Sequence, residues 1–185
     1  QLGANLQQTK MLREDRIDHA LETLKRFSRI VKTADLGSVH AIATAAARQA
    51  VNAKDFLDPA EKILKNNIRV LSGKEEALLV AQGLLANIPK ANGIIGDLGG
   101  GSLELIRVKK GIISDAISLN FGHLSGGNIK ELSEKIRSFK WNNDGTEEYF
   151  YGVGGSFRAL GLAYKYKRKY PIDLLHGLSI PIKKT

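Results

Sequence analysis

The chain has 185 residues, of which 43% are hydrophobic and 25% are charged, and this indicates one ordinary domain or two small lobes. The same composition excludes collagen-like, disordered and low-complexity chains. Cysteine is absent, which excludes disulfides, thiolate metal sites and cysteine nucleophiles. No apolar run approaches the ~18–20 residues of a membrane span and no signal peptide opens the sequence, so we expect a cytoplasmic protein without a membrane partner. The net charge of +9 fits either a polyanionic ligand or a protein that is merely soluble and basic.

The first half of the sequence predicts helices that alternate with short strands. Apolar residues recur at three- and four-residue steps between Glu14 and Ala34, a spacing typical of an amphipathic helix. Asp58 and Pro59 indicate the N-cap and the first residue of a short helix. In chain order we predict helix 14–34, strand 39–43, helix 44–50, helix 59–64, strand 68–71 and helix 75–87.

The second half predicts a sheet. Lys109, Lys110 and Gly111 join two strand-like runs and are typical of a hairpin turn. Because strands alternate with helices and one pair forms a hairpin, the predicted fold class is α/β, with a mixed, partly parallel sheet and flanking helices. A composition shift at 89–92 divides the chain into predicted lobes 1–89 and 90–185. In chain order we predict strands 93–98, 103–108 and 112–119, helix 128–136, a polar loop 141–146, strand 148–153 and helix 157–166.

The glycine-rich run Gly99–Ser102 follows Asp97, which ends a predicted buried strand. Glycine amides can approach phosphate oxygens without a clash from Cβ, and the serine hydroxyl adds a donor. Asp97 is placed to hold a divalent cation or to orient a water. Glu104 lies two residues after Ser102, on the same face of the next strand. A tight β-turn that binds nothing is the alternative interpretation.

A second glycine-rich turn, Gly154–Ser156, stands between a predicted strand and a predicted helix. The free N–H groups and the dipole of a helix N-terminus attract phosphate. The flanking residues match neither a Walker A loop nor a dinucleotide-binding fingerprint. An ordinary strand-to-helix turn is the alternative.

Glu75 and Glu76 stand in the first turn of the predicted helix 75–87. Either both complement the helix dipole, or one of them is the general base for a water. Adjacent helical residues point about 100° apart, and the apolar positions of this helix favour Glu76 as the inward residue. Arg48, at the start of a short helix behind a strand, either clamps an anion with its guanidinium or is a surface residue.

A basic cluster with interleaved tyrosines follows at Lys165–Lys169. Such a cluster either contacts nucleic acid or polyphosphate, or it is a solvated helix end. If the ligand is a polyanion, we expect the excess of Lys and Arg to form a positive stripe that leads to the Gly99–Ser102 loop. The four histidines show no metal-ligand spacing, and we assign none of them to catalysis.

Taken together, these segments resemble the Ppx/GppA family of exopolyphosphatases and guanosine pentaphosphate phosphohydrolases. Their order and spacing follow those of the family, and the resemblance covers nearly the whole chain. The matching segments are 43–50, 70–77, 95–104 and 153–156, with 170–177 as a further one.

The resemblance implies two lobes of the actin/sugar-kinase/Hsp70 type, which are ribonuclease H-like, with the active site in the cleft. It implies hydrolysis of the terminal phosphoanhydride of inorganic polyphosphate, or of the γ-phosphate of guanosine pentaphosphate, with Mg²⁺ as the cofactor. By analogy Glu76 is the base that activates water, while Asp97 and Glu104 serve the cation. The implied phosphate-binding residues are Arg48, Gly99, Gly100, Gly101, Ser102, Gly154, Gly155 and Ser156.

Alternatives stay open at this stage. The family's first phosphate loop is not found ahead of Gln1, and we expect the second lobe to continue beyond Thr185, so an inactive fragment is one alternative. A kinase or ATPase of the same superfamily is another, and a non-catalytic polyanion-binding protein is a third. The expected partners are polyphosphate or guanosine pentaphosphate and no specific nucleic acid, with a homodimer left undecided.

Overall fold

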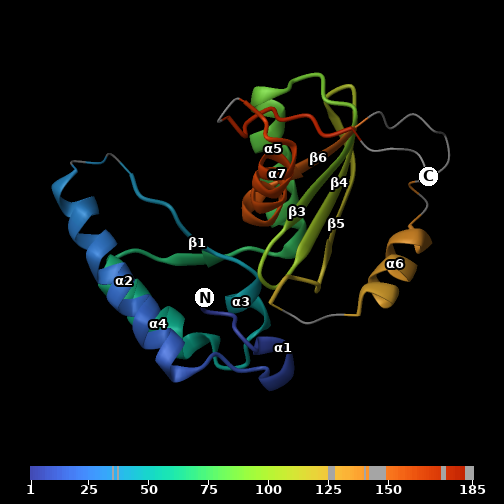
Figure 1. The fold of residues 1–185 in the computed structure, drawn as a ribbon. Coiled ribbons are helices and arrows are strands. Elements are labelled where there is room, and N and C mark those ends of the chain that lie inside the picture. Colours follow the sequence, from blue (N-terminus) through green and yellow to red (C-terminus); the bar gives the residue numbers. More distant parts are fainter. Residues whose placement is uncertain are drawn as a thin grey trace.

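The computed structural model describes residues 1–34, 36, 38–124, 128–139, 141, 149–171 and 174–181. Helices around a small sheet make up its first half, and a larger sheet with its own helices makes up the second (Figure 1). Except for Trp141, the predicted polar loop 141–146 lies outside the described residues. The elements are α1 (Leu6–Thr9), α2 (Glu14–Thr33), β1 (Ala41–Ala43), α3 (Ala45–Gln49), α4 (Ala53–Leu64), β2 (Ile68–Val70), α5 (Gly73–Asn87), β3 (Gly93–Leu98), β4 (Leu103–Lys109), β5 (Ile112–Leu119), α6 (Ile129–Ser138), β6 (Tyr149–Val153) and α7 (Gly154–Arg168).

In the first half, β1 and β2 form a two-stranded parallel sheet. The helices α2 and α4 lie side by side (Figure 1). Their apolar faces bury Ile17, Phe56 and Ala60 together with Leu6 and Leu12 of the N-terminal segment. Removing this apolar surface from water, at about 25 cal/mol per Å², is what holds the helices together.

The helix α4 differs from the prediction. Pro59 lies inside this helix rather than at its start, so the predicted start at Pro59 is wrong. A proline inside a helix removes one N–H donor and crowds the preceding turn. Burial of Phe56 and Ala60 against their neighbours offsets this cost, because packing of an amphipathic face contributes more to a helix than local preference does.

The second half is built on a four-stranded sheet with the strand order β5-β4-β3-β6. The strands β3, β4 and β5 are antiparallel neighbours, whereas β6 runs parallel to β3. This confirms the predicted mixed sheet and the predicted hairpin at Lys109–Gly111. The sheet positions β3 as an inner strand, and its carboxyl end carries Asp97 and Leu98.

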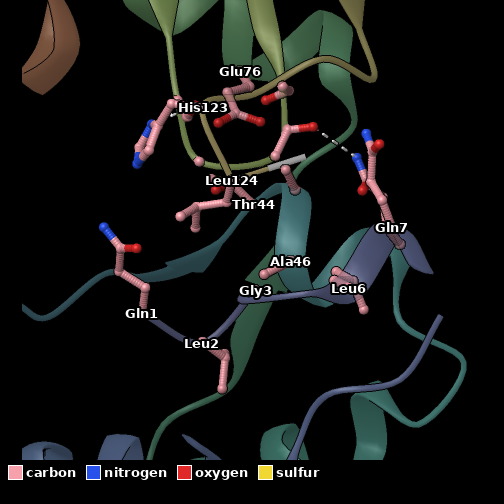
Figure 2. A pocket seen from close by; sticks show the side chains of 16 residues that line it. Gln1, Leu2, Gly3, Leu6, Gln7, Thr44, Ala46, Glu76, His123 and Leu124 are labelled. Carbon is pink, nitrogen blue, oxygen red and sulfur yellow. Dashed lines mark hydrogen bonds between the residues drawn. The ribbon is translucent and has the colours of Figure 1, made fainter. Parts of the chain in front are cut away.

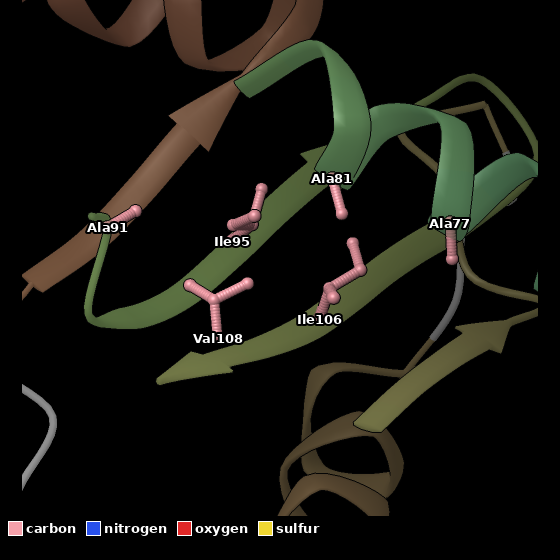
Figure 3. Close-up of a cluster of buried hydrophobic side chains, with 6 residues drawn as sticks. All are labelled: Ala77, Ala81, Ala91, Ile95, Ile106 and Val108. Carbon is pink, nitrogen blue, oxygen red and sulfur yellow. The ribbon is translucent and has the colours of Figure 1, made fainter. Parts of the chain in front are cut away.

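The core of the second half lies between this sheet and α5 (Figure 3). Ala77 and Ala81 of α5 face Ile95 of β3 and Ile106 and Val108 of β4, and none of these five side chains is exposed to solvent. The alanines let the helix approach the sheet closely. By its packing α5 thus goes with the four-stranded sheet, although the predicted lobe boundary placed its residues with 1–89.

The helix α7 packs on β3 and β6. A Cβ on Gly152 would lie 2.6 Å from the ring of Phe157, and one on Gly96 would lie 2.4 Å from the ring of Phe150. Gly96 alternates with Ile95 along β3, so α7 and α5 cover opposite faces of the sheet. The helix begins at Gly154 rather than at the predicted Phe157, because the turn residues themselves form its first turn.

Within the described residues, none of the helices is both long enough and apolar enough to cross a membrane.

Candidate functional site

The Gly99–Ser102 loop joins β3 to β4 and is fixed by backbone hydrogen bonds. The Gly99 N–H donates to the Ser102 carbonyl at 2.9 Å. From the segment after β5, the His123 N–H donates to the Gly99 carbonyl at 3.1 Å, and the Leu124 N–H donates to the Gly100 carbonyl at 3.0 Å. A Cβ on Gly122 would lie 2.1 Å from the Gly100 carbonyl oxygen, so only glycine at 122 allows this approach.

These bonds set the direction of the loop amides. In a trans peptide the N–H points away from the carbonyl of the same peptide unit. Because the Gly99 and Gly100 carbonyls point to residues 123 and 124, the amides of Gly100 and Gly101 point away from them. In the described part of the chain neither amide donates a hydrogen bond. Two adjacent amides of this kind are donors for an anion.

Asp97 and Glu104 are cross-strand partners on β3 and β4, so their side chains share one face of the sheet. Burial, followed by the charge of Glu76, raises the pKa of Asp97 above its ordinary value. Glu104 is only 1% exposed, and burial raises its pKa as well, although hydrogen bonds from Ser118, at 2.8 Å, and from Ser102 oppose the rise. Two desolvated carboxylates side by side favour a cation.

The two acids at the start of α5 have different partners. Ser72 and Glu75 form a reciprocal capping box, and Glu75 also pairs with Arg69. The backbone N–H and hydroxyl of Ser72, followed by Arg69, lower the pKa of Glu75 to about 2. Glu76 instead turns inward and contacts Arg48 at 3.0 Å. Glu75 is thus occupied in capping the helix, and Glu76 is not.

Arg48 of α3 has one guanidinium nitrogen to spare. Its Nη1 donates to the Leu71 carbonyl at 2.7 Å and to Glu76 Oε2 at 3.0 Å. Its Nη2 is buried and has no hydrogen-bond partner among the described residues. A buried donor without a partner costs free energy, and an anion at this position would remove that cost.

A cavity of about 310 Å³ lies beside the glycine loop. Figure 2 shows Glu76 and His123 on one side of it and Gln1, Leu2 and Gly3 on the other. The residues that line it are Gln1, Leu2, Gly3, Leu6, Gln7, Thr44, Ala45, Ala46, Gln49, Glu76, Gly99, Gly100, Gly101, Ser102, His123 and Leu124. Of the predicted site residues, Glu76 and the Gly99–Ser102 loop therefore share one cavity.

The remaining predicted site residues do not line this cavity. Gly154 has φ +82°, and a Cβ on it would lie 2.2 Å from Asp97 Oδ1, so the start of α7 abuts the Asp97 carboxylate. Ser156 Oγ donates to the Leu98 carbonyl at 2.7 Å, which ties α7 to the end of β3. Glu104 lies behind Ser102, in the interior.

Comparison with known proteins identifies the family of this chain. The profile of the Ppx/GppA phosphatase family matches residues 1–128 of the 185. The chain belongs to this family.

Solved structures show the same fold. The chain is similar to an exopolyphosphatase from Cytophaga hutchinsonii, with a TM-score of 0.74 and 22% identity over 89% of this chain and 59% of that one. It is also similar to the Ppx/GppA family member of Aquifex aeolicus, with a TM-score of 0.64 and 25% identity over 93% and 60%. An exopolyphosphatase-like protein has a TM-score of 0.76 and 23% identity over 88% and 57%. These matches confirm the predicted α/β fold class, and the chain spans about 60% of the length of the structures it matches.

Sequence reasoning missed several residues of this Ppx/GppA cavity. His123 was given no role, yet its Nδ1 lies 3.0 Å from the Gly99 carbonyl oxygen. Gln49, also unpredicted, contacts the Gly101 carbonyl at 3.4 Å and Asn120 Oδ1 at 3.1 Å. A signal for His123 was present, because the predicted hairpin brings the end of strand 112–119 beside the start of strand 103–108, where the glycine loop ends. Nothing in the sequence indicated that residues of the segment Gln1–Gln7 line the cavity.

The basic cluster Lys165–Lys169 lies away from the cavity. It forms the last turn and the C-cap of α7, a 15-residue helix, so roughly 15 Å of helix separates it from Ser156. Lys165 is buried, and Arg168 lies 5.9 Å from the Tyr164 ring centre. The cluster is therefore no part of the glycine-loop site.

A metal at this site would depend on few protein ligands. Among the described residues, no group of three or more His, Asp or Glu side chains is close enough to hold a metal ion. Mg²⁺ in phosphate-handling sites is commonly held by one or two carboxylates together with waters and substrate phosphates. The Asp97–Glu104 pair, with its raised pKa values, fits that donor set.

Proposed function

We propose that this protein hydrolyses the terminal phosphoanhydride bond of inorganic polyphosphate and releases orthophosphate. The observation that carries the proposal is the shared cavity, which is lined by both the Glu76 carboxylate and the Gly99–Ser102 loop. A base and an anion cradle that face one space are what attack of water on a phosphate requires. Guanosine pentaphosphate ends in the same type of bond and is a second substrate candidate.

The phosphate would be held by donors from three elements. The amides of Gly100 and Gly101 point away from the 123–124 segment and are unused. Arg48 Nη2 is the buried, unpaired cationic donor beside Glu76. Negative charge develops on the phosphoryl oxygens in the transition state, and such fixed donors stabilise it. Gly99 and Ser102 complete the loop, and Gly154, Gly155 and Ser156 supply a helix N-terminus next to Asp97.

Glu76 would act as the general base. It accepts a proton from the attacking water while the water oxygen bonds to the terminal phosphorus and the bridging P–O bond breaks. The shortened chain leaves as a phosphate anion. Arg48 holds Glu76 Oε2 at 3.0 Å, which fixes the carboxylate and leaves its other oxygen, Oε1, for the water.

A divalent cation, Mg²⁺, would be held by Asp97. When bound, it neutralises charge on the phosphates and so supplies the electrostatic stabilisation that phosphoryl transfer needs. Asp97 is the better placed of the two acids, because Glu104 is buried behind Ser102 and bonded to two hydroxyls. Glu104 would serve the cation site by adding negative charge and by orienting Ser102.

The family supports the reaction class, since Ppx/GppA proteins are described as phosphatases. The Cytophaga hutchinsonii structure is named an exopolyphosphatase, but at 22% identity it supports the fold rather than the substrate.

The direct test is phosphate release from polyphosphate, guanosine pentaphosphate and ATP, each with and without Mg²⁺. The proposal predicts Mg²⁺-dependent release from polyphosphate, with or without release from guanosine pentaphosphate, and none from ATP. Release from ATP alone would favour a kinase or ATPase of the same superfamily. Tight polyphosphate binding without turnover would favour a polyanion-binding protein, and both outcomes would contradict the proposal.

A further inference from the structure

His123 contributes a side chain to the cavity that the proposed reaction does not use. It stands in the segment after β5 and lines the cavity opposite Gln1–Gly3. Its ring Nδ1 lies 3.0 Å from the Gly99 carbonyl oxygen, which also accepts the backbone N–H of the same residue at 3.1 Å. A carbonyl oxygen can only accept, so Nδ1 carries the hydrogen of this bond.

This contact fixes the orientation of the ring. With Nδ1 directed at Gly99, the other nitrogen, Nε2, lies on the edge of the ring away from the loop. The second neighbour of Nδ1 is Ser156 Oγ at 3.5 Å, too far for a strong bond, and that hydroxyl already donates to Leu98. Among the described residues, Nε2 has no hydrogen-bond partner, and the residue is exposed.

The described side chains in and around the cavity are more acidic than basic. Of the described side chains that line it, Glu76 is the only acid, and His123 is the only one that can carry a positive charge. Asp97 and Glu104 lie just beyond the glycine loop and add two further carboxylates. A phosphate chain entering this space meets negative charge from three acids, and Arg48 is already shared with Glu76.

We propose that His123 is a further substrate-binding residue, and that its Nε2–H, on an imidazolium held in place by Gly99, donates to a phosphoryl oxygen of the bound phosphate chain. This rests on the proposed function and adds a cationic contact to it. With both nitrogens carrying hydrogen, the ring has one donor for the loop and one for the ligand. His123 thereby links the position of the Gly99 peptide to the presence of the anion.

Two substitutions distinguish the roles of the two ring nitrogens of His123. An asparagine amide reaches as far as Nδ1, so His123→Asn keeps a donor for Gly99 and removes the Nε2 contact. A glutamine amide reaches as far as Nε2, so His123→Gln keeps a donor for the ligand and weakens the bond to Gly99. Because His123 is exposed, both variants should fold, and their circular dichroism and melting temperature check this.

The measurement is the dissociation constant of inorganic triphosphate in the presence of Mg²⁺, by titration calorimetry on the 185-residue chain. Loss of a charged hydrogen bond typically weakens binding by about 10–100-fold. We expect that loss for His123→Asn and a clearly smaller one for His123→Gln. With polyphosphate as the substrate, His123→Asn should raise KM and leave kcat nearly unchanged.

Any result in which His123→Asn binds triphosphate as well as, or better than, His123→Gln overturns the inference. In that case the ring only positions the loop or has no role. The failure of the proposed function looks different, because the wild-type protein would then neither bind triphosphate nor release phosphate from polyphosphate. Wild-type turnover together with equal affinity of the two variants would reject the role of His123 alone.

Discussion

Glu75 and Glu76 are adjacent and chemically identical, yet their surroundings differ. Glu75 caps α5 and pairs with Arg69, while Glu76 lines the cavity and contacts Arg48. Glu76→Gln should therefore lower turnover by about 10²–10⁴-fold, the usual effect of removing a positioned base, while triphosphate binding survives. Glu75→Gln is the matched control and should change turnover little. Steady-state phosphate release measures both, and a larger loss in Glu75→Gln would mean that the wrong residue has been named as the base.

The ionised, buried carboxylate of Asp97 lowers the stability of the fold, and melting temperatures measured over a range of pH can detect this. Its pKa is raised in the folded protein, mainly by burial, so the fold retains a proton that the unfolded chain releases. Stability conferred by that proton is lost as pH rises from the unfolded value of 3.8 through the folded one. Without divalent cations, Asp97→Asn should then raise the melting temperature at pH 7 and not at pH 3. An equal change at both pH values, or a lower melting temperature at pH 7, would contradict this origin of the shift.

At the residue scale, sequence patterns were informative where the chemistry is local. Two features could be predicted from the sequence, the run from Asp97 to Ser102 and the acid pair Glu75 and Glu76, because their positions follow the strand and helix periods. Periodicity does not reveal His123, because its contact is with a carbonyl 24 positions earlier in the chain, and only the predicted hairpin indicates that the two lie close. The buried position of Glu104 behind Ser102 likewise depends on how β5 pairs with β4, since Ser118 supplies one of its hydrogen bonds.

At the scale of elements, the junction between β6 and α7 gives a sharp comparison. Gly154 has φ +82°, and a Cβ there would meet Asp97 Oδ1 at 2.2 Å, whereas a Cβ on Gly155 would meet nothing within 4 Å. Gly154→Ala should destabilise the protein by more than about 1 kcal/mol and weaken Mg²⁺-dependent phosphate release. Gly155→Ala, in the same helical turn, should leave stability unchanged or raise it by up to about 1 kcal/mol.

Urea denaturation of both variants, together with phosphate-release assays, checks this comparison. If Gly154→Ala were as stable and as active as Gly155→Ala, the contact between the start of α7 and Asp97 would have no consequence for the site.

Element boundaries show where local rules give way to packing. The hairpin at Lys109–Gly111 and the strand over 112–119 follow directly from turn residues and apolar runs. The start of α4 does not, because Pro59 signals a helix start while Phe56, one turn earlier, is already buried in the helical core. The prediction for the start of α7 is wrong for the opposite reason. Gly154 and Gly155 weaken the helical signal of a turn that nevertheless forms.

At the scale of the molecule, the hydrophobic core between α5 and the four-stranded sheet positions the site. Ile106 is fully buried between β4 and α5, the helix that carries Glu76. Ile106→Ala should cost about 2–5 kcal/mol of unfolding free energy, because it leaves a cavity as well as losing apolar burial. Ile129 on α6 is 74% exposed, and Ile129→Ala should stay within about 0.5 kcal/mol of the wild type. Urea denaturation provides both values, and equal values for the two variants would contradict the assigned core.

The packing of α5 on the four-stranded sheet was not predictable from composition. The shift in composition falls at 89–92, after the helix, while Ala77 and Ala81 of that helix contact strands further along the chain. Small residues leave little periodic signal, so which sheet the helix covers follows only from the assembled fold. This placement is also what brings Glu76 to the same cavity as the glycine loop.

The central claim is that the cavity beside the Gly99–Ser102 loop binds a phosphate chain. Backbone amide NMR tests it most directly, by titration of the 185-residue chain with inorganic triphosphate and Mg²⁺. The account predicts saturable shifts of the Gly100, Gly101 and Ser102 amides, with smaller shifts at Gly154–Ser156. Shifts confined to the basic cluster Lys165–Lys169 at the far end of α7, or none at all at the glycine loop, would contradict it.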